Sequence, residues 1–111
     1  MSIYLKNALP DFAAELRHLL ETAGENALAQ QVDGLQIVER CTCHDDFCAS
    51  FYTQPKPQGP YGPNHESLDL DAEKGMIILD TVNGVIAHVE VLNRAEIRTT
   101  LLSLLPDSGT S

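Results

Sequence analysis

Three cysteines and a histidine stand close together in the middle of the chain, and these residue types can bind a metal or carry thiol chemistry. The cysteines follow the pattern C-x-C-x4-C at positions 41, 43 and 48, and His44 lies between them. Thiolates and neutral imidazoles are the ligands of tetrahedral structural zinc sites. The sequence therefore allows a zinc site built from Cys41, Cys43, Cys48 and His44, with His65 or an aspartate as alternatives to His44.

A β-hairpin would position these cysteines. Residues 35–43 alternate between two faces, and a second strand, rich in aromatic and small residues, begins at Cys48. A short turn between the two strands places Cys43 opposite Cys48 and Cys41 opposite Ser50. Because residues i and i+2 of a strand share a face, we expect all three cysteines on one side of this hairpin.

Two other interpretations of the cysteines stay open. Cysteine is among the most buried residue types and behaves as a small apolar side chain, so the three thiols are also interpreted as packing residues. A disulfide between Cys43 and Cys48 would suit facing strand positions. Three cysteines, however, do not form a closed disulfide framework, and the chain has no C-x-x-C redox motif.

A second hairpin is the clearest structural signal. Apolar, β-branched runs over 76–82 and 85–92 are separated by Asn83-Gly84, two residues that tolerate the positive φ of a two-residue turn. The implied register places Val82 opposite Val85 and continues without interruption. It predicts a core face that consists of Met76, Ile78, Asp80, Val82, Val85, Ala87, Val89 and Val91.

The other face of this hairpin is the leading candidate for an interface. It carries Ile77, Leu79 and Thr81 opposite Ile86, His88 and Glu90, which makes it too apolar for an ordinary solvent face. A domain of this size has few helices to cover such a face, and exposed apolar patches mark interaction sites. We expect self-association, most simply a homodimer, through an interface of Ile77, Leu79, Ile86 and His88.

Acid–base catalysis is the alternative on that face. His88 and Glu90 could transfer protons as a pair, but no nucleophile or substrate pocket can be recognised around them in the sequence. We therefore expect no catalytic residues and favour a non-enzymatic binding or regulatory module.

Helices are predicted at both ends of the chain. Apolar stripes indicate helices over 10–23 and 26–32. Asn93 and Glu96 form the pattern of a capping box at the start of a last helix, which Pro106 ends.

The whole chain is predicted to be one α+β domain. Four prolines make 54–64 a stiff loop, and 67–71 forms a short edge strand. The expected architecture is two N-terminal helices, an antiparallel β meander of four to five strands and a C-terminal helix. This single domain spans 1–111, with a flexible tail from about 106.

The charge of the chain excludes several classes of partner. Seven basic and 16 acidic residues give a formal net charge of −9. Such a chain has no electrostatic footprint for nucleic acid and is repelled by anionic membranes. No apolar run reaches the ~18–20 residues of a membrane helix, and no secretory signal is visible, so we expect a cytoplasmic protein. The acidity also suits an immunity-type inhibitor of a basic protein partner.

The segment Cys41–Thr53, which contains C-x-C-x-D-x-x-C-x-S-F-Y-T, resembles a family of small uncharacterised bacterial proteins. The likeness continues through Gly75–Asp80 and Val89–Arg94, and it covers roughly residues 35–105. The resemblance implies a hairpin followed by a short final helix. It implies no activity and transfers no catalytic residue, so zinc remains the one cofactor that the residues themselves allow.

Overall fold

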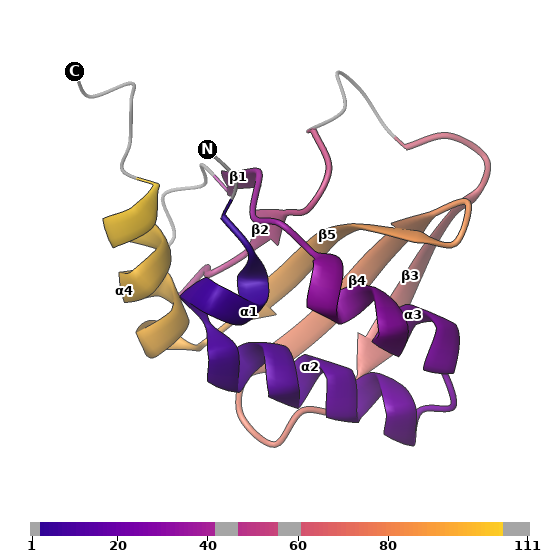
Figure 1. Cartoon of the computed structure of the whole chain (residues 1–111), viewed down its shortest axis with the longest axis horizontal. Coiled ribbons are helices and arrows are strands. Elements are labelled where there is room, and N and C mark those ends of the chain that lie inside the picture. Colours follow the sequence, from indigo (N-terminus) through magenta and orange to yellow (C-terminus); the bar gives the residue numbers. More distant parts are fainter. Residues whose placement is uncertain (1–2, 42–46, 56–60, 106–111) are drawn as a thin grey trace.

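The computed structural model describes residues 3–41, 47–55 and 61–105. In sequence order, helices come first, five strands follow, and α4 comes last (Figure 1). Its elements are α1 (Leu5–Ala8), α2 (Pro10–Thr22), α3 (Asn26–Gln31), a 3-10 turn (Val32–Gly34), β1 (Glu39–Arg40), β2 (Phe51–Tyr52), β3 (His65–Leu70), β4 (Met76–Val82), β5 (Val85–Leu92) and α4 (Ala95–Leu104). The α+β class, the antiparallel sheet and the C-terminal helix are confirmed. The predicted tail from about 106 lies outside the described residues.

The five strands form one sheet in the order β1-β2-β5-β4-β3, and every neighbouring pair is antiparallel. This order departs from a simple meander because β2 pairs with β5 rather than with β3. The long hairpin of β4 and β5 thereby occupies the middle of the sheet. Each of these two strands therefore has a neighbouring strand on both sides, and its side chains can meet those of the neighbours on either face of the sheet.

The helices pack on one face of this sheet (Figure 1). Phe12, Leu16 and Leu20 form the buried stripe of α2, and Ile97 and Leu101 form that of α4. These side chains share one core cluster with the buried residues of the strands. Full burial of each such side chain stabilises the fold by about 1.5–3 kcal/mol. The helix stripes thus decide which face of the sheet becomes the core.

The turn between β4 and β5 forms as predicted. Asn83 and Gly84 have φ values of 54° and 78°, the left-handed conformation that such a turn needs. The side-chain amide of Gln31 in α3 accepts a hydrogen bond from the Ile86 N–H and donates one to the Gly84 carbonyl oxygen. This single side chain ties the short helix α3 to the tip of the central hairpin.

The hairpin departs from the expected register after its first pairs. Val82 faces Val85, as predicted, but Asp80 faces His88 because a β-bulge leaves Ala87 as an extra residue on β5. The Ala87 carbonyl oxygen accepts hydrogen bonds from the backbone N–H groups of Thr53 and Gln54, which follow β2. The segment after β2 therefore supplies the hydrogen bonds of the carbonyl group at the bulge. No pattern in the sequence of the hairpin predicts this contact.

The observed burial contradicts the predicted core face of β4. Ile77, Leu79 and Ile86 have 0% exposed surface and lie beneath the helices, so the prediction that they form an exposed interface is wrong. Val89 and Val91 are buried as expected, but they face Leu79 and Ile77 rather than Ile78 and Met76. His88, the fourth predicted interface residue, lies on the opposite face, which no helix of the described chain covers.

Two local expectations also need correction. The segment predicted as one long strand from residue 35 pairs first with the N-terminal residues, since the Ile37 N–H donates to the Ile3 carbonyl oxygen, and β1 is therefore short. Asn93 adopts a φ of 64° instead of capping α4, and Arg94 takes the N-cap position. Glu96 binds the Arg94 guanidinium rather than completing a capping box.

Candidate functional site: the outward face of the sheet

The sheet face that points away from the helices is called the outward face here, and its residues follow from the strand register. Directly paired residues of antiparallel strands lie on the same face. One row crosses all five strands and consists of Glu39, Tyr52, His88, Asp80 and Ser67. A second row consists of Glu90, Ile78 and Asp69, and a third consists of Leu92 and Met76. His65 and Val82 lie on the other side of the first row.

Asp80 is the centre of this face and accepts three hydrogen bonds. Its Oδ1 atom lies 2.9 Å from Nε2 of His65 and 2.7 Å from Oγ of Ser67. Its Oδ2 atom lies 3.0 Å from Nδ1 of His88. Side chains from β3, β4 and β5 thus meet at one carboxylate, which is only 14% exposed.

These hydrogen bonds keep Asp80 ionised. Burial alone would raise its pKa, but the hydrogen bonds from His65, Ser67 and His88 outweigh that effect and hold the pKa of this carboxyl below its ordinary value. Each imidazole therefore donates one ring N–H to this carboxylate.

Two tyrosines border the cluster. The Tyr52 ring packs against His88 with 4.5 Å between ring centroids, and the Tyr61 ring packs against His65 at 4.7 Å. The Tyr61 hydroxyl is buried and has no hydrogen-bond partner among the described residues. Burial, followed by the negative charge of Asp80, raises the pKa of Tyr61 above its ordinary value.

The cluster resembles the base half of a catalytic triad but lacks the rest of one. A carboxylate that orients an imidazole through Nδ1 can make Nε2 a general base. In the described residues, however, both His65 and His88 have Asp80 as their one side-chain hydrogen-bond partner, and no hydroxyl or thiol is bound to either ring. A nucleophile is therefore not in place within the part of the chain that the structure describes.

Metal binding at the cluster is not supported either. Among residues 3–41, 47–55 and 61–105, no group of three or more His, Cys, Asp or Glu side chains is arranged to hold a metal ion. His65 Nε2 and His88 Nδ1 approach different oxygens of the Asp80 carboxylate, which is the geometry of two separate hydrogen bonds.

The outward face carries negative charge without any cation among the described residues. Its carboxylates are those of Glu39, Asp69, Asp80 and Glu90. Described lysines and arginines lie elsewhere: Lys6 in α1, Arg17 in α2, Lys74 between β3 and β4, Arg94 and Arg98 at α4, and Arg40 in β1 opposite the core residue Phe51. The fold thus separates charge and leaves one acidic sheet face.

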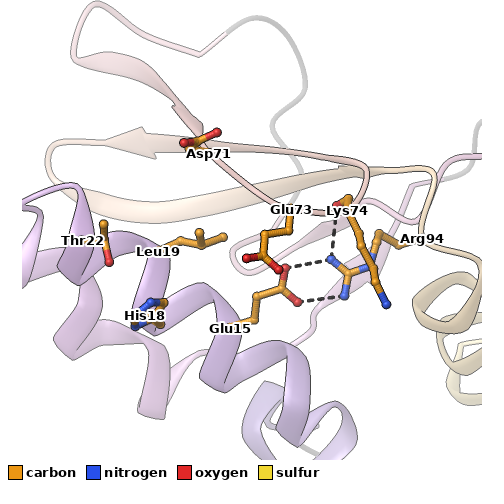
Figure 2. Close-up of a pocket in the computed structure, with 8 residues that line it drawn as sticks. All are labelled: Glu15, His18, Leu19, Thr22, Asp71, Glu73, Lys74 and Arg94. Atoms are coloured by element: carbon orange, nitrogen blue, oxygen red, sulfur yellow. Dashed lines mark hydrogen bonds and ion pairs between the residues drawn. The ribbon is translucent and has the colours of Figure 1, made fainter.

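A cavity away from the outward face is bordered by a network of ion pairs. It measures about 480 Å³ and lies between α2 and the connection from β3 to β4, as Figure 2 shows. Arg94 lines it and binds both carboxylate oxygens of Glu15, at 2.8 and 2.9 Å, as well as Glu96 at 2.8 Å. These hydrogen bonds, together with one to the Lys74 carbonyl oxygen, engage four of the five N–H groups of the guanidinium. Carboxylates and cations are mixed along the wall, so no ligand chemistry is singled out there.

The cysteines are partly placed by the structure. The Cys41 N–H donates to the Ser50 carbonyl oxygen at 2.8 Å, which matches the predicted pairing of these two residues. Cys41 and Cys48 line the same small pocket beside Arg98 of α4. Cys43 and His44 lie outside the described residues, so the predicted zinc ligand set and the Cys43–Cys48 pairing stay predictions.

Sequence reasoning found one part of this site and missed the rest. It placed His88 and Glu90 on one face, as the structure does, and kept His65 only as an alternative zinc ligand. It assigned Asp80 to the core, although an acidic residue in the middle of an apolar run is itself a signal of an outward face.

No helix within the described residues is long and apolar enough to cross a membrane. Comparison of the chain with protein-family models, with curated proteins and with solved structures finds no match.

Proposed function

We propose that the protein is a small non-enzymatic binding module that docks a basic protein partner on its outward face. One observation carries the proposal: among the described residues, the formal charges on this face are all negative, and apolar side chains lie between them. Complementary charge steers association and rejects partners of the wrong sign. An acidic sheet face therefore favours a partner with lysines and arginines.

The second row of the face supports this proposal, because it offers a place for such a side chain. Ile78 lies between Asp69 and Glu90 on the neighbouring strands. Lysine and arginine combine an apolar stem with a charged head, so the stem would pack on Ile78 while the head reaches either carboxylate. Met76, 45% exposed, and Leu92 extend the apolar surface at the same end.

A second copy of the chain is the other candidate occupant, and the charge argues against it. Packing two outward faces together would bring the carboxylates of Glu39, Asp69 and Glu90 near those of the second copy. Like charges brought together across an interface oppose association. The apolar residues that motivated self-association in the sequence are buried in the core, which leaves the basic partner as the favoured occupant.

A charge-neutralising variant tests the proposal directly. The probe is rhodamine-labelled octa-arginine, and its binding is followed by fluorescence anisotropy at neutral pH. The test variant is Glu39→Gln/Asp69→Asn/Glu90→Gln on the outward face. Each exposed ion pair contributes about 0.2–1 kcal/mol, so we expect the triple variant to weaken binding by at least about threefold.

The matched control removes the same number of carboxylates from the helix side of the molecule. It is Glu25→Gln/Asp71→Asn/Glu73→Gln, which combines two glutamates and one aspartate, as the test variant does. Binding close to that of the unmodified chain is expected. Equal losses in the two variants would mean that the peptide senses only total charge, and the outward face would lose its special role.

Zinc binding is a second candidate function, because Cys41 and Cys48 line one small pocket. We expect about one zinc per chain after purification under reducing conditions without chelator, and loss of this zinc in Cys48→Ser. Cys41→Ser should have the same effect, and chelator should destabilise the chain. A metal-free protein with three titratable thiols would leave the cysteines as packing residues.

A further inference from the structure

We propose that the basic partner docks as an extended segment, which pairs with the free edge of β3 and adds one strand to the sheet. The inference rests on the proposed function and adds the backbone conformation of the partner. It starts from the strand order, in which β3 comes last and no strand of the described chain pairs with its other side (Figure 1). Addition of a peptide strand to an exposed sheet edge is a recurring mode of recognition.

The contacts between β3 and β4 show which backbone groups of β3 are already used. The Asn83 N–H donates to the carbonyl oxygen of Asn64, just before β3. These two residues stand opposite each other and continue the register in which His65 faces Val82. In an antiparallel pair, positions that exchange hydrogen bonds alternate with positions that do not. The residues of β3 that bond to β4 are therefore Glu66, Leu68 and Leu70.

The residues between them present their backbone to the open edge. The N–H and carbonyl groups of Ser67 and Asp69 point away from β4, and both residues are exposed. The His65 N–H lies on the same edge but donates to the Gly62 carbonyl oxygen. Ser67 and Asp69 each offer one donor and one acceptor, which is the template that an additional strand requires.

The opposite edge of the sheet is a poorer template. β1 has two residues, whereas β3 has six. The chain just before β1 is already paired, since the Ile37 N–H donates to the Ile3 carbonyl oxygen and Tyr4 forms a β-bridge with Gln36. Arg40 also places a positive charge in β1, which disfavours a basic segment.

The charges of β3 select a basic segment for its edge. The strand carries the exposed residues Glu66 and Asp69 and contains no lysine or arginine. Asp69 lies on the outward face, where a cation opposite it would extend the row of Ile78 and Glu90. Glu66 has the other parity, so cations on either face of an added strand find a carboxylate. A second copy paired through its own β3 would instead bring like charges together.

The experiment compares three rhodamine-labelled octa-arginine peptides, and their binding to the unmodified chain is followed by fluorescence anisotropy. The first peptide has no methyl groups on its backbone, the second is N-methylated at every second residue, and the third is N-methylated at every residue. N-methylation keeps the charge but removes the N–H donor and blocks the strand edge. Because the N–H groups of a strand alternate between its two edges, the second peptide keeps one edge for pairing and the third keeps none.

We expect the fully methylated peptide to bind at least about tenfold more weakly than the unmethylated one. Tenfold corresponds to about 1.4 kcal/mol, which is the net contribution of roughly one to two backbone hydrogen bonds. The alternately methylated peptide should bind more like the unmethylated peptide than like the fully methylated one. Equal losses in both methylated peptides would overturn strand addition, because one open edge suffices for pairing.

Amide hydrogen exchange on the unmodified chain locates the contact. The N–H groups of Ser67 and Asp69 should exchange readily in the free chain and become protected by saturating octa-arginine. Those of Glu66 and Leu68 should be protected already, because they bond to β4. Unchanged exchange at Ser67 and Asp69 would overturn the proposal.

A proline blocks the edge from the side of the protein. Ser67→Pro removes an N–H that points away from β4, a position at which edge strands tolerate proline. Ser67→Ala is the comparison, because it also loses the hydroxyl contact with Asp80 but keeps the N–H. We expect Ser67→Pro to bind octa-arginine at least about tenfold more weakly than Ser67→Ala, or about 1.4 kcal/mol. Equal binding of the two variants would contradict strand addition, and if Ser67→Pro does not fold, the peptide series decides.

The outcomes separate this inference from the proposed function. Octa-arginine that binds equally well with and without backbone methylation overturns strand addition and leaves the proposed function standing, because charge alone then accounts for docking. Absence of binding by all three peptides overturns both.

Discussion

Arg94 connects α2 with the start of α4 through its side chain. It is 8% exposed, binds Glu15 of α2 and Glu96 of α4, and lies with its guanidinium 5.8 Å from the centre of the Phe12 ring. The hydrogen bonds to Glu15 raise the pKa of this guanidinium above its ordinary value despite its burial, so it stays charged. One cation thereby joins the first long helix to the last one.

Removal of this cation should destabilise the fold strongly. We expect Arg94→Met to lower the free energy of unfolding by about 2–3 kcal/mol, somewhat less than the ~3–5 kcal/mol of a fully buried pair, because Glu15 keeps access to water. Arg17→Met is the control, since Arg17 makes only exposed ion pairs, and it should cost at most about 1 kcal/mol. Urea unfolding measures both, and equal losses would contradict the special role of Arg94.

Gly75 is the second residue whose identity the structure explains. Its φ is +66°, and an added Cβ would collide with the Leu92 carbonyl oxygen. The close approach of the two backbones is needed where the connection from β3 enters β4. A side chain at this position therefore meets both an unfavourable backbone conformation and a rigid atom.

Gly75→Ala should consequently lower the free energy of unfolding by about 1–3 kcal/mol. Gly34→Ala provides the comparison, because the space around a Cβ at Gly34 is open and its φ is not positive. That control should be neutral or slightly stabilising. Thermal unfolding of the two variants side by side tests the argument, and a neutral Gly75→Ala would show that the backbone can move apart.

Among the elements, the central hairpin determines the site. On the two sides of the bulge at Ala87, Ile86 points into the core and His88 points outward. There His88 forms a hydrogen bond with Asp80. The same carboxylate accepts hydrogen bonds from Ser67 and His65 of β3. Asp80 is therefore both the centre of the outward face and a connection between three strands.

This connection should make stability depend on pH in the acidic range. The pKa of Asp80 is lower in the folded chain than in the unfolded chain, so the unfolded chain takes up the proton first as the pH falls. The contribution of Asp80 is complete above its unfolded pKa of ~3.9 and is lost as the pH falls through the lower folded pKa.

We expect Asp80→Asn to lose about 1–3 kcal/mol at pH 7, because hydrogen bonds to a charged acceptor are weakened. From pH 6 to pH 3 the variant should lose less further stability than the unmodified chain. Urea unfolding across this range measures the difference. Asp69→Asn, on the same face but with an exposed side chain, should follow the unmodified chain. A curve for Asp80→Asn parallel to that of the unmodified chain would refute the assigned role.

For the whole molecule, the uneven distribution of charge matters more than the net charge of −9. The helix side combines acids with arginines in ion pairs, whereas the described part of the outward face has carboxylates alone. Self-repulsion of this face should keep copies of the chain apart at low ionic strength.

Sedimentation velocity tests this expectation. At low salt the chain should sediment as a monomer of 12.1 kDa across micromolar concentrations. Glu39→Gln/Asp69→Asn/Glu90→Gln should increase any tendency to associate, because it removes the repulsion and leaves Ile78 and Met76 in place. A dimer of the unmodified chain at low salt would contradict this expectation.

The sequence by itself determined several elements of this protein, although it predicted neither the helix α1 nor the short length of β1. The apolar stripe at Phe12 and Leu16 sufficed for α2, and Asn83-Gly84 sufficed for the central turn. It also determined that Val89 and Val91 face the core, because polar and apolar residues alternate from His88 to Val91. Each of these signals is local, since helix periodicity, strand alternation and turn geometry depend on neighbours along the chain.

Tertiary structure decided which face of the sheet is open and which side chains meet on it. The Ala87 carbonyl oxygen at the bulge accepts hydrogen bonds from Thr53 and Gln54, more than thirty residues earlier in the chain. A one-residue shift of register exchanges the two faces of a strand, so the extra residue in β5 puts Val89 and Val91 on the same face as Ile77 and Leu79 and puts His88 beside Asp80 on the other. The convergence of His65 and His88 on Asp80 likewise requires β3 to pair with β4, which no local pattern specifies, because it depends on how the strands pack against the helices.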